Sequence, residues 1–273
     1  VEVRLLSPDG DVGASLVTYL SFLTNATPDF PPLAVATLVD VAGPPSLQPD
    51  GNVVLPADTL ARARARVQVL RATPGVPLTL APRPETLEGL AADPAGAGLV
   101  EQLAEQAAER PVFARPFVDV DLAALQRAGL ISEANAQADG GANVVRTRLG
   151  VEPTGGMWLS GPTLGAEAAR LAVGLGIDRA VVPPSAVGDG EPSTPPAAPV
   201  RLGEGGPLAM VSDAALAAHL TSDDGMVAAH RFIAELAITW LEAPSIRRGV
   251  VVHLPAGAQI DPEVVAVALG ALA

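Results

Sequence analysis

The sequence predicts an α/β fold, a (β/α) barrel of about seven strand–helix units. In the stretch Val76–Gly129, an apolar run bounded by proline passes twice into an Ala- and Leu-rich amphipathic segment. The same alternation runs from Leu33 to the end of the chain. Proline at the carboxyl ends of several short runs favours a barrel over an open doubly wound sheet. Seven units are one fewer than the eight-unit form has, so an incomplete or distorted barrel is expected.

Seven short apolar runs, bounded by turn-forming residues, are expected to be the strands. They are Leu33–Ala42, Val76–Pro82, Pro111–Val118, Gly156–Ser160, Asp178–Pro183, Pro207–Val211 and Gly249–Pro255. The carboxyl ends of such strands share one rim, where barrels place their sites. Polar residues at these ends are therefore the first candidates for function.

Helical periodicity follows most of these strands. The expected helices are Ala57–Ala72, Pro84–Ala92, Gly98–Glu109, Asp121–Ala128, Ser132–Leu149, Leu164–Gly174, Asp213–Leu220, Gly225–Glu242 and Pro262–Leu272. Ser212 is expected to cap the helix that follows it. Gly140 and Gly141 are expected to interrupt theirs. The alternation of Arg62, Arg64 and Arg66 predicts a solvated helix face.

The amino-terminal part differs from the rest of the chain. Val1–Ser7 alternates like a strand and ends at the turn signal Pro8–Gly10. Val12–Leu23 fits a strand or a helix, and a short helix or irregular segment is the preferred interpretation. The expected organisation is a flanking strand and linker of a preceding module at 1–32, followed by the barrel at 33–273.

Composition excludes several function classes. The net charge is −13, all 17 basic residues are arginine, and no basic block occurs, so nucleic-acid binding is not expected. The chain has no cysteine, which excludes disulfide scaffolds and thiolate chemistry. No apolar run is long enough to insert into a membrane. The Pro-, Gly- and Ser-rich stretch Ser185–Pro199 is expected to be the longest loop.

Four segments carry a resemblance to known families: ATLVDVAG, PLTLAPRPETLEGLA, RPFVDVDLAALQRAGL and AAHRFIAELAITWLEAPSIRRGVVVHLPAG. The strand–helix pattern resembles the barrel shared by polysaccharide deacetylases and certain retaining glycosidases. The order of segments is similar to the middle domain of exported, membrane-anchored actinobacterial proteins encoded beside the peptidoglycan-precursor flippase. The resemblance implies an extracytoplasmic domain, anchored through regions outside this chain. It also implies a cell-envelope protein or a cell-wall glycan as partner.

The resemblance also implies a metal site, which the residues do not support. Metal-dependent deacetylases of this kind need two Asp after the first strand and two His after the second. Here the first strand ends with Asp40 alone, and Pro82–Glu85 contains no His. His219, His230 and His253 lack ligand spacing to one another. No metal and no cofactor are therefore expected.

Glycosidase chemistry needs two carboxyl groups, one of them a proton donor. The nucleophile that the resemblance implies, a Glu after the fourth strand, is replaced by Trp158–Gly161. The remaining catalytic candidates are Asp40, Asp119 and Asp121. Helix capping is the preferred interpretation for Asp121, and a place in a first helical turn is preferred for Glu85. Asp40 and Asp119 are therefore the first choices.

Trp158, Arg83, Glu85 and His253 are the candidates for ligand binding, because each lies at a predicted strand end. An exposed Trp158 could stack on a sugar, although core packing is the preferred interpretation. Two functions remain open. The preferred one is a catalytically silent barrel that binds another protein, the preferred ligand, or a glycan. The alternative is an active glycan hydrolase that uses strand-end carboxylates.

Overall fold

Parallel strands alternating with helices form the body of the structure, a computed structural model that describes residues 2–17, 30–159, 165–187 and 198–272. One sheet has the order β4-β3-β9 and the other β5-β6-β8-β7, and only β7 runs antiparallel to its neighbour. The strands are β3 (Ala34–Val41), β4 (Leu78–Pro82), β5 (Met157–Leu159), β6 (Arg179–Val182), β7 (Val200–Arg201), β8 (Leu208–Val211) and β9 (Gly249–Leu254). Most of the expected loop Ser185–Pro199 lies outside the described residues.

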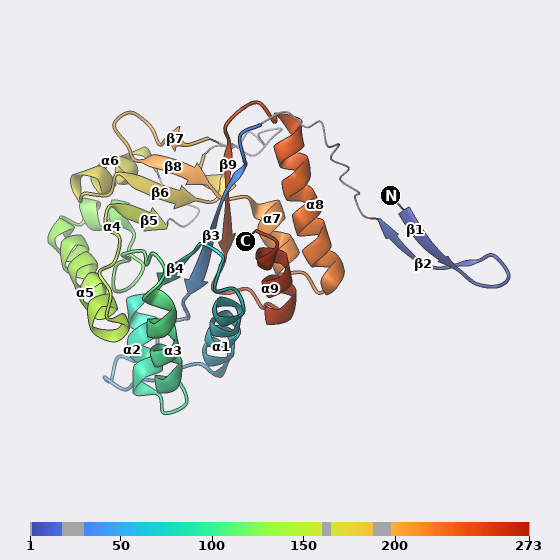
Figure 1. Ribbon diagram of the computed structural model, residues 1–273. Helices are drawn as coiled ribbons and strands as arrows, with labels where there is room; N and C mark the ends of the chain where they lie inside the picture. The colour runs from blue at the N-terminus through green and yellow to red at the C-terminus, as the bar shows by residue number, and fades with distance from the viewer. Residues whose placement is uncertain (1, 18–29, 160–164, 188–197, 273) are drawn as a thin grey trace.

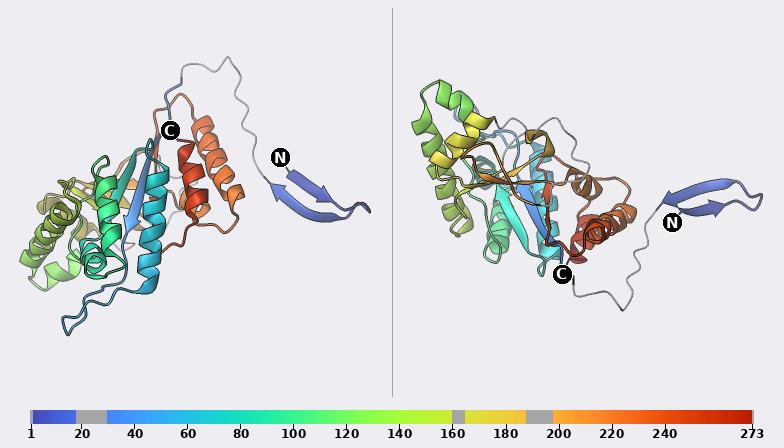
Figure 2. Two further views of the ribbon diagram at one scale, coloured as in Figure 1. Left: turned by 60° about the horizontal axis from the view of Figure 1, so that its bottom comes forward. Right: turned by 90° about the horizontal axis from the view of Figure 1, so that it is seen from above.

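Helices surround these strands in three groups, α1–α3, α4–α6 and α7–α9 (Figure 1 and Figure 2). They are α1 (Ala57–Ala72), α2 (Pro84–Ala92), α3 (Ala97–Ala107), α4 (Leu122–Arg127), α5 (Ile131–Leu149), α6 (Ala166–Gly174), α7 (Ala214–Leu220), α8 (Met226–Glu242) and α9 (Pro262–Gly270), with a short 3₁₀ turn at Pro184–Ala186. In the described ranges, no helix combines the length and the apolar character needed to cross a bilayer.

The two sheets are linked by single β-bridges and do not form one closed sheet in the described part of the chain. Val112 bridges β4, Phe113 bridges Thr154, and Ser212 at the end of β8 bridges β9. The expected strand Pro111–Val118 is therefore reduced to two bridging residues. Proline has no N–H to donate to a sheet, so the prolines of this segment prevent a longer ladder.

The strands nevertheless share one apolar interior. A single apolar cluster has members from seven segments. These are β3, β4, β5, β6, β8, β9 and the bridging segment, Val112 and Phe113. The members of the cluster are Leu38, Ala81, Phe113, Met157, Leu159, Val181, Met210 and Val251. The opposite faces of β3, β4 and β9 pack against helices, including α1, α3 and α8, in the largest core cluster. Alternate residues of these strands thus point inward to the shared cluster and outward to the helices.

The amino-terminal prediction was partly wrong. β1 (Glu2–Leu6) pairs antiparallel with β2 (Val12–Val17) in a two-stranded sheet of its own, drawn apart from the body in Figure 1. The first six residues of Val12–Leu23 are therefore strand and not helix, and residues 18–23 lie outside the described ranges. The turn between the strands includes Gly10 with φ of 89°, and it reverses the chain so that the second apolar run pairs with the first.

Two details of the helices also differ from expectation. Ser212 does not cap α7; the carboxylate of Asp213 accepts a hydrogen bond from the Leu216 N–H at 3.0 Å. Gly140 and Gly141 do not interrupt α5, which is continuous. A Cβ at position 141 would lie 2.0 Å from the carbonyl oxygen of Arg115. Gly141 therefore lets the segment after Phe113 lie directly against the helix.

This contact predicts a sharp difference between neighbouring glycines. Gly141→Ala should lower the free energy of unfolding by about 1–3 kcal/mol, because the segment that carries Arg115 must move away from α5. Gly140→Ala is the matched control, since its Cβ would lie 3.9 Å from Phe117, an ordinary contact. The control should be neutral, or stabilising by up to about 1 kcal/mol through helix propensity. Urea unfolding of both variants measures the difference, and equal effects would contradict the role of Gly141.

Candidate functional site

Asp40 lies at the carboxyl end of β3 with only 7% of its surface exposed. Its Oδ1 accepts a hydrogen bond from Nη1 of Arg115 at 2.8 Å, and its Oδ2 lies 3.6 Å from Nε2 of His253 on β9. The parallel pairing of β3 with β9 brings Asp40 and His253 to the same edge. Two of the predicted site residues are therefore neighbours.

Arg115, which the sequence reasoning did not single out, connects this pair to Asp119. Its Nη1 also donates to the Ala81 carbonyl at 3.1 Å, and its Nη2 donates to Oδ1 of Asp119 at 2.9 Å. Arg83, directly after β4, donates from Nη2 to the other oxygen of Asp119 and from Nη1 to the Gly43 carbonyl. We call these five residues the rim cluster: Asp40, Arg83, Arg115, Asp119 and His253.

The electrostatics of the rim cluster keep Asp40 ionised. Burial alone raises the pKa of the Asp40 carboxyl, but the close approach of the His253 ring and the positive charges of Arg115 and Arg83 outweigh it, so the pKa lies below its ordinary value. Asp119 has a different environment, because its side chain is 56% exposed. The cluster thus contains one buried, fixed carboxylate and one carboxylate that reaches solvent.

Arg66 holds the backbone of Asp40 from the opposite side. The prediction that Arg66 lies on a solvated face was wrong, because the residue is 1% exposed. Its Nε donates to the Asp40 carbonyl at 3.0 Å, and its other nitrogens donate to four further carbonyl oxygens, of Arg62, Pro255, Ala256 and Ala258. Burial lowers the pKa of Arg66 to about 10, partly offset by the negative charge of Asp40, so the side chain stays charged at neutral pH.

Arg66 shares its helix face with the buried Ala63, three residues before it, and Leu70, four residues after it. That spacing is the sequence signal that marks Arg66 as buried. Arg115 has a weaker signal: it is a charged residue within the third expected strand, Pro111–Val118, and stands directly before a proline.

Glu85 is buried and forms no hydrogen bond with a rim-cluster side chain in the described residues. Its Oε1 accepts hydrogen bonds from the N–H and hydroxyl of Ser46, both at 2.6 Å, and from the Leu47 N–H at 3.0 Å. Thr86 accepts the Gly43 N–H at 3.1 Å in the same region. These bonds attach the loop after β3 to the first turn of α2, so Glu85 has a structural role here.

Asp121 and Trp158 also lie outside the rim cluster. Asp121 caps α4 by accepting the Ala124 N–H at 2.9 Å, as the capping interpretation predicts. Trp158 on β5 is half-buried and packs against α6 and the neighbouring strands. Of the remaining histidines, His219 pairs with Glu235 at 2.5 Å and His230 is exposed on α8.

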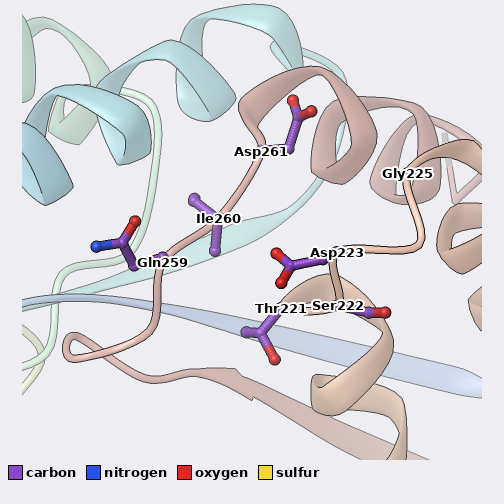
Figure 3. A pocket seen from close by; sticks show the side chains of 7 residues that line it. All are labelled: Thr221, Ser222, Asp223, Gly225, Gln259, Ile260 and Asp261. Atoms are coloured by element: carbon purple, nitrogen blue, oxygen red, sulfur yellow. The ribbon is translucent and has the colours of Figure 1, made fainter.

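A separate polar pocket of about 350 Å³ lies between the α7–α8 turn and the segment before α9 (Figure 3). It is lined by Thr221, Ser222, Asp223, Gly225, Gln259, Ile260 and Asp261. Asp261 caps α9 through the Glu263 N–H at 2.9 Å. The pocket shares no residue with the rim cluster, and its two acids do not by themselves make a site.

Comparison with known proteins identifies the fold. No protein-family model matches the sequence, and no curated protein matches it. A Mycobacterium smegmatis structure assigned provisionally as a polysaccharide deacetylase aligns with a TM-score of 0.58 at 13% identity, over 94% of this chain and 87% of that one. The 4-alpha-glucanotransferase of Thermococcus litoralis aligns with a TM-score of 0.55 at 16% identity, over 81% of this chain and 32% of the enzyme.

A GH57-type branching enzyme from Pyrococcus horikoshii aligns with a TM-score of 0.56 at 13% identity, over 87% of this chain and 67% of that one. The chain therefore has a deacetylase- and glycosidase-like fold. It spans about a third of the glucanotransferase and two thirds of the branching enzyme.

The metal that deacetylase chemistry implies does not fit the rim cluster. No group of three or more His, Cys, Asp or Glu side chains in the described residues is arranged to hold a metal ion. The guanidinium of Arg115 is bonded to Asp40, and that of Arg83 lies close enough to lower the pKa of this carboxyl. A divalent cation at Asp40 would be repelled by both positive charges, so the rim cluster is not suited to hold a metal ion.

The Asp40–Arg115 pair predicts a measurable pH dependence of stability. Asp40→Asn should lower the free energy of unfolding at pH 7 by about 3–5 kcal/mol, because Arg115 loses its buried counter-charge. Because the folded-state pKa of Asp40 is lowered, its contribution is complete above the unfolded-state pKa of about 3.9 and is lost as the pH falls through the folded-state pKa. The difference between wild type and variant should therefore narrow below about pH 4.

Urea unfolding of both proteins between pH 7 and pH 2.5 measures this difference. Asp58→Asn is the matched control, because Asp58 is exposed in its 2.5 Å pair with Arg62. Its substitution should lower the free energy of unfolding much less than Asp40→Asn does. A wild-type-to-variant difference that stays constant over the whole pH range would show that Asp40 is not stabilised as an ionised group.

Proposed function

We propose that this chain is a catalytically silent, deacetylase- and glycosidase-like domain that binds a cell-wall glycan. The observation that carries the proposal is the bonding of Arg115 to both Asp40 and Asp119. These carboxylates are the two strand-end acids that could have formed a catalytic pair. Each is instead engaged by a guanidinium.

Hydrolysis of a glycosidic bond needs one protonated carboxyl as the acid and one free carboxylate as nucleophile or base. Asp40 does not suit the acid, because a lowered pKa leaves it ionised at neutral pH. It does not suit the nucleophile either, because it is buried and bonded to Arg115. Both oxygens of Asp119 are bonded to guanidinium groups. In the rim cluster, both carboxylates are therefore held as ionised groups in ion pairs.

We infer that the strands of this domain form an incomplete (β/α) barrel over residues 33–273, with 1–32 as a flanking element. The single bridges between the two sheets support this arrangement, as does the shared interior cluster with members from seven segments. The regular strand pairing is interrupted in two places in the described residues. Single bridges replace it between β4 and β5, through Val112, Phe113 and Thr154, and between β8 and β9, through Ser212. In such a barrel, the rim cluster would lie at the carboxyl edge, where related folds place their ligands.

The cell-envelope part of the proposal is supported by the sequence resemblance to exported actinobacterial proteins encoded beside the peptidoglycan-precursor flippase. We propose on that basis an extracytoplasmic domain that binds peptidoglycan strands or their precursors, and that is held at the membrane by regions outside this chain. The carbohydrate-active proteins among the structural neighbours are consistent with a glycan ligand.

The test combines binding with turnover. The protein should co-sediment with insoluble peptidoglycan and should release neither acetate nor reducing ends from peptidoglycan or N-acetylated chitooligosaccharides. Asp119→Asn and the exposed Asp139→Asn on α5 should behave like the wild type in the turnover assay. Turnover that disappears in Asp119→Asn but persists in Asp139→Asn would establish the alternative, an active glycan hydrolase. Absence of co-sedimentation would overturn the glycan ligand.

A further inference from the structure

The rim cluster is nearly neutral on an acidic protein. The whole chain carries a net charge of −13. In the cluster, the guanidinium groups of Arg83 and Arg115 balance the carboxylates of Asp40 and Asp119. If the carboxylate of Asp119 is displaced, two guanidinium groups face the one remaining carboxylate. The resulting surplus of one positive charge attracts an anion to a surface that otherwise repels it.

We propose that Arg83 and Arg115, with His253 beside them, bind one anionic group of a sugar ligand, a carboxylate or a phosphate, and that Asp119 occupies this position until the ligand displaces it. The proposal rests on the glycan-binding function above and specifies the chemistry of the ligand. It assigns Asp119 the role of an internal competitor.

The two guanidinium groups already hold a carboxylate between them. Oδ1 of Asp119 accepts from Nη2 of Arg115 at 2.9 Å, while Oδ2 accepts from Nη2 of Arg83. One carboxylate thus takes one oxygen to each arginine. Paired guanidinium groups recognise the carboxylate or phosphate of a ligand in the same way.

Arg83 has an unused donor on the edge that faces Asp119. Nε and Nη2 donate along the same edge of the planar guanidinium, so a carboxylate or phosphate bound side-on accepts from both. Of these two Arg83 donors, only Nη2 is bonded to Asp119. The Nε of Arg83 is buried and has no hydrogen-bond partner in the described residues, and the same holds for Nε2 of His253. An anionic oxygen at Nε would remove the cost of a buried donor without an acceptor.

Asp119 is also the member of the cluster that can leave. Its side chain is 56% exposed and belongs to the loop between Phe113 and α4, outside any helix or strand. Because the exposed Asp119 carboxylate can exchange its arginine partners for water, it is displaced at a lower cost than a buried carboxylate would be. Asp40 cannot be displaced in this way, because it is buried and its backbone is held by Arg66.

Isothermal titration calorimetry of the full chain with three probes tests the proposal. N-acetylmuramic acid carries a carboxylate, inorganic phosphate carries the alternative anion, and N-acetylglucosamine is the neutral sugar. Asp119→Ser should bind the anionic probes about fivefold more tightly than the wild type does, which corresponds to about 1 kcal/mol of removed competition. Arg83→Gln should weaken anion binding by about tenfold or more, as expected for the loss of a charge-assisted pair.

Arg148→Gln is the matched control, because it removes one positive charge from a surface pair with Glu88 and should leave anion binding unchanged. A preference for the muramic acid or for phosphate identifies which anion the site takes, and either preference supports the proposal. Anion binding that Asp119→Ser does not tighten would overturn it, as would equal losses in Arg83→Gln and Arg148→Gln. If Arg83→Gln does not fold, as judged by circular dichroism, Asp119→Ser decides alone.

The same experiment separates this inference from the proposed function. Binding of peptidoglycan or of N-acetylglucosamine that is unaffected by Asp119→Ser and Arg83→Gln would reject the anion site while leaving the glycan-binding function intact. Turnover of peptidoglycan would reject the silent function, whatever the anion affinities are.

Discussion

Two buried guanidinium groups hold the carboxyl end of β3, and the geometry of the rim depends on them. Arg115 bonds the side chain of Asp40, and Arg66 bonds its carbonyl and three carbonyls of the loop before α9. A buried charge is tolerated only when its hydrogen-bonding capacity is met. Here backbone carbonyls meet most of that capacity, so β3, the bridging segment and the β9–α9 loop are tied together at one point.

The same bonds limit the chemistry of the site. A catalytic carboxyl pair works because the environments of the two groups push their pKa values apart. Around Asp40, the neighbours Arg115, Arg83 and His253 all favour the ionised form, so this carboxyl is unsuited to be the protonated member of such a pair. This electrostatic environment supports the proposal of binding without turnover.

Periodicity predicted most elements, because long apolar patterns such as that of α8 depend on local sequence alone. The failures have physical causes that involve partners distant in sequence. Gly141 was predicted to interrupt its helix, but the structure shows that glycine is needed there because the Arg115 carbonyl lies against it. The sequence suggested a surface position for Arg66, because the carbonyl oxygens that accept its hydrogen bonds, those of Asp40 and Pro255, are distant from it in the sequence. Asp40, Asp119, Arg83 and His253 were chosen as strand-end residues and do come together, but Arg115, which joins them, was missed because arginine before proline carries no catalytic signature.

Burial divides the rim cluster into a permanent part and an exchangeable part. Removing a partner from a buried ion pair costs several kcal/mol, whereas an exposed pair is worth about 1 kcal/mol or less. Asp40 and Arg115 are each less than a tenth exposed, so their pair persists as long as the domain is folded. Asp119 is bonded to the same guanidinium but reaches solvent. Asp40 thus fixes the guanidinium of Arg115 in position, whereas the bond from this guanidinium to the exposed Asp119 can be broken. This difference makes a structural ion pair suitable as part of the proposed ligand site.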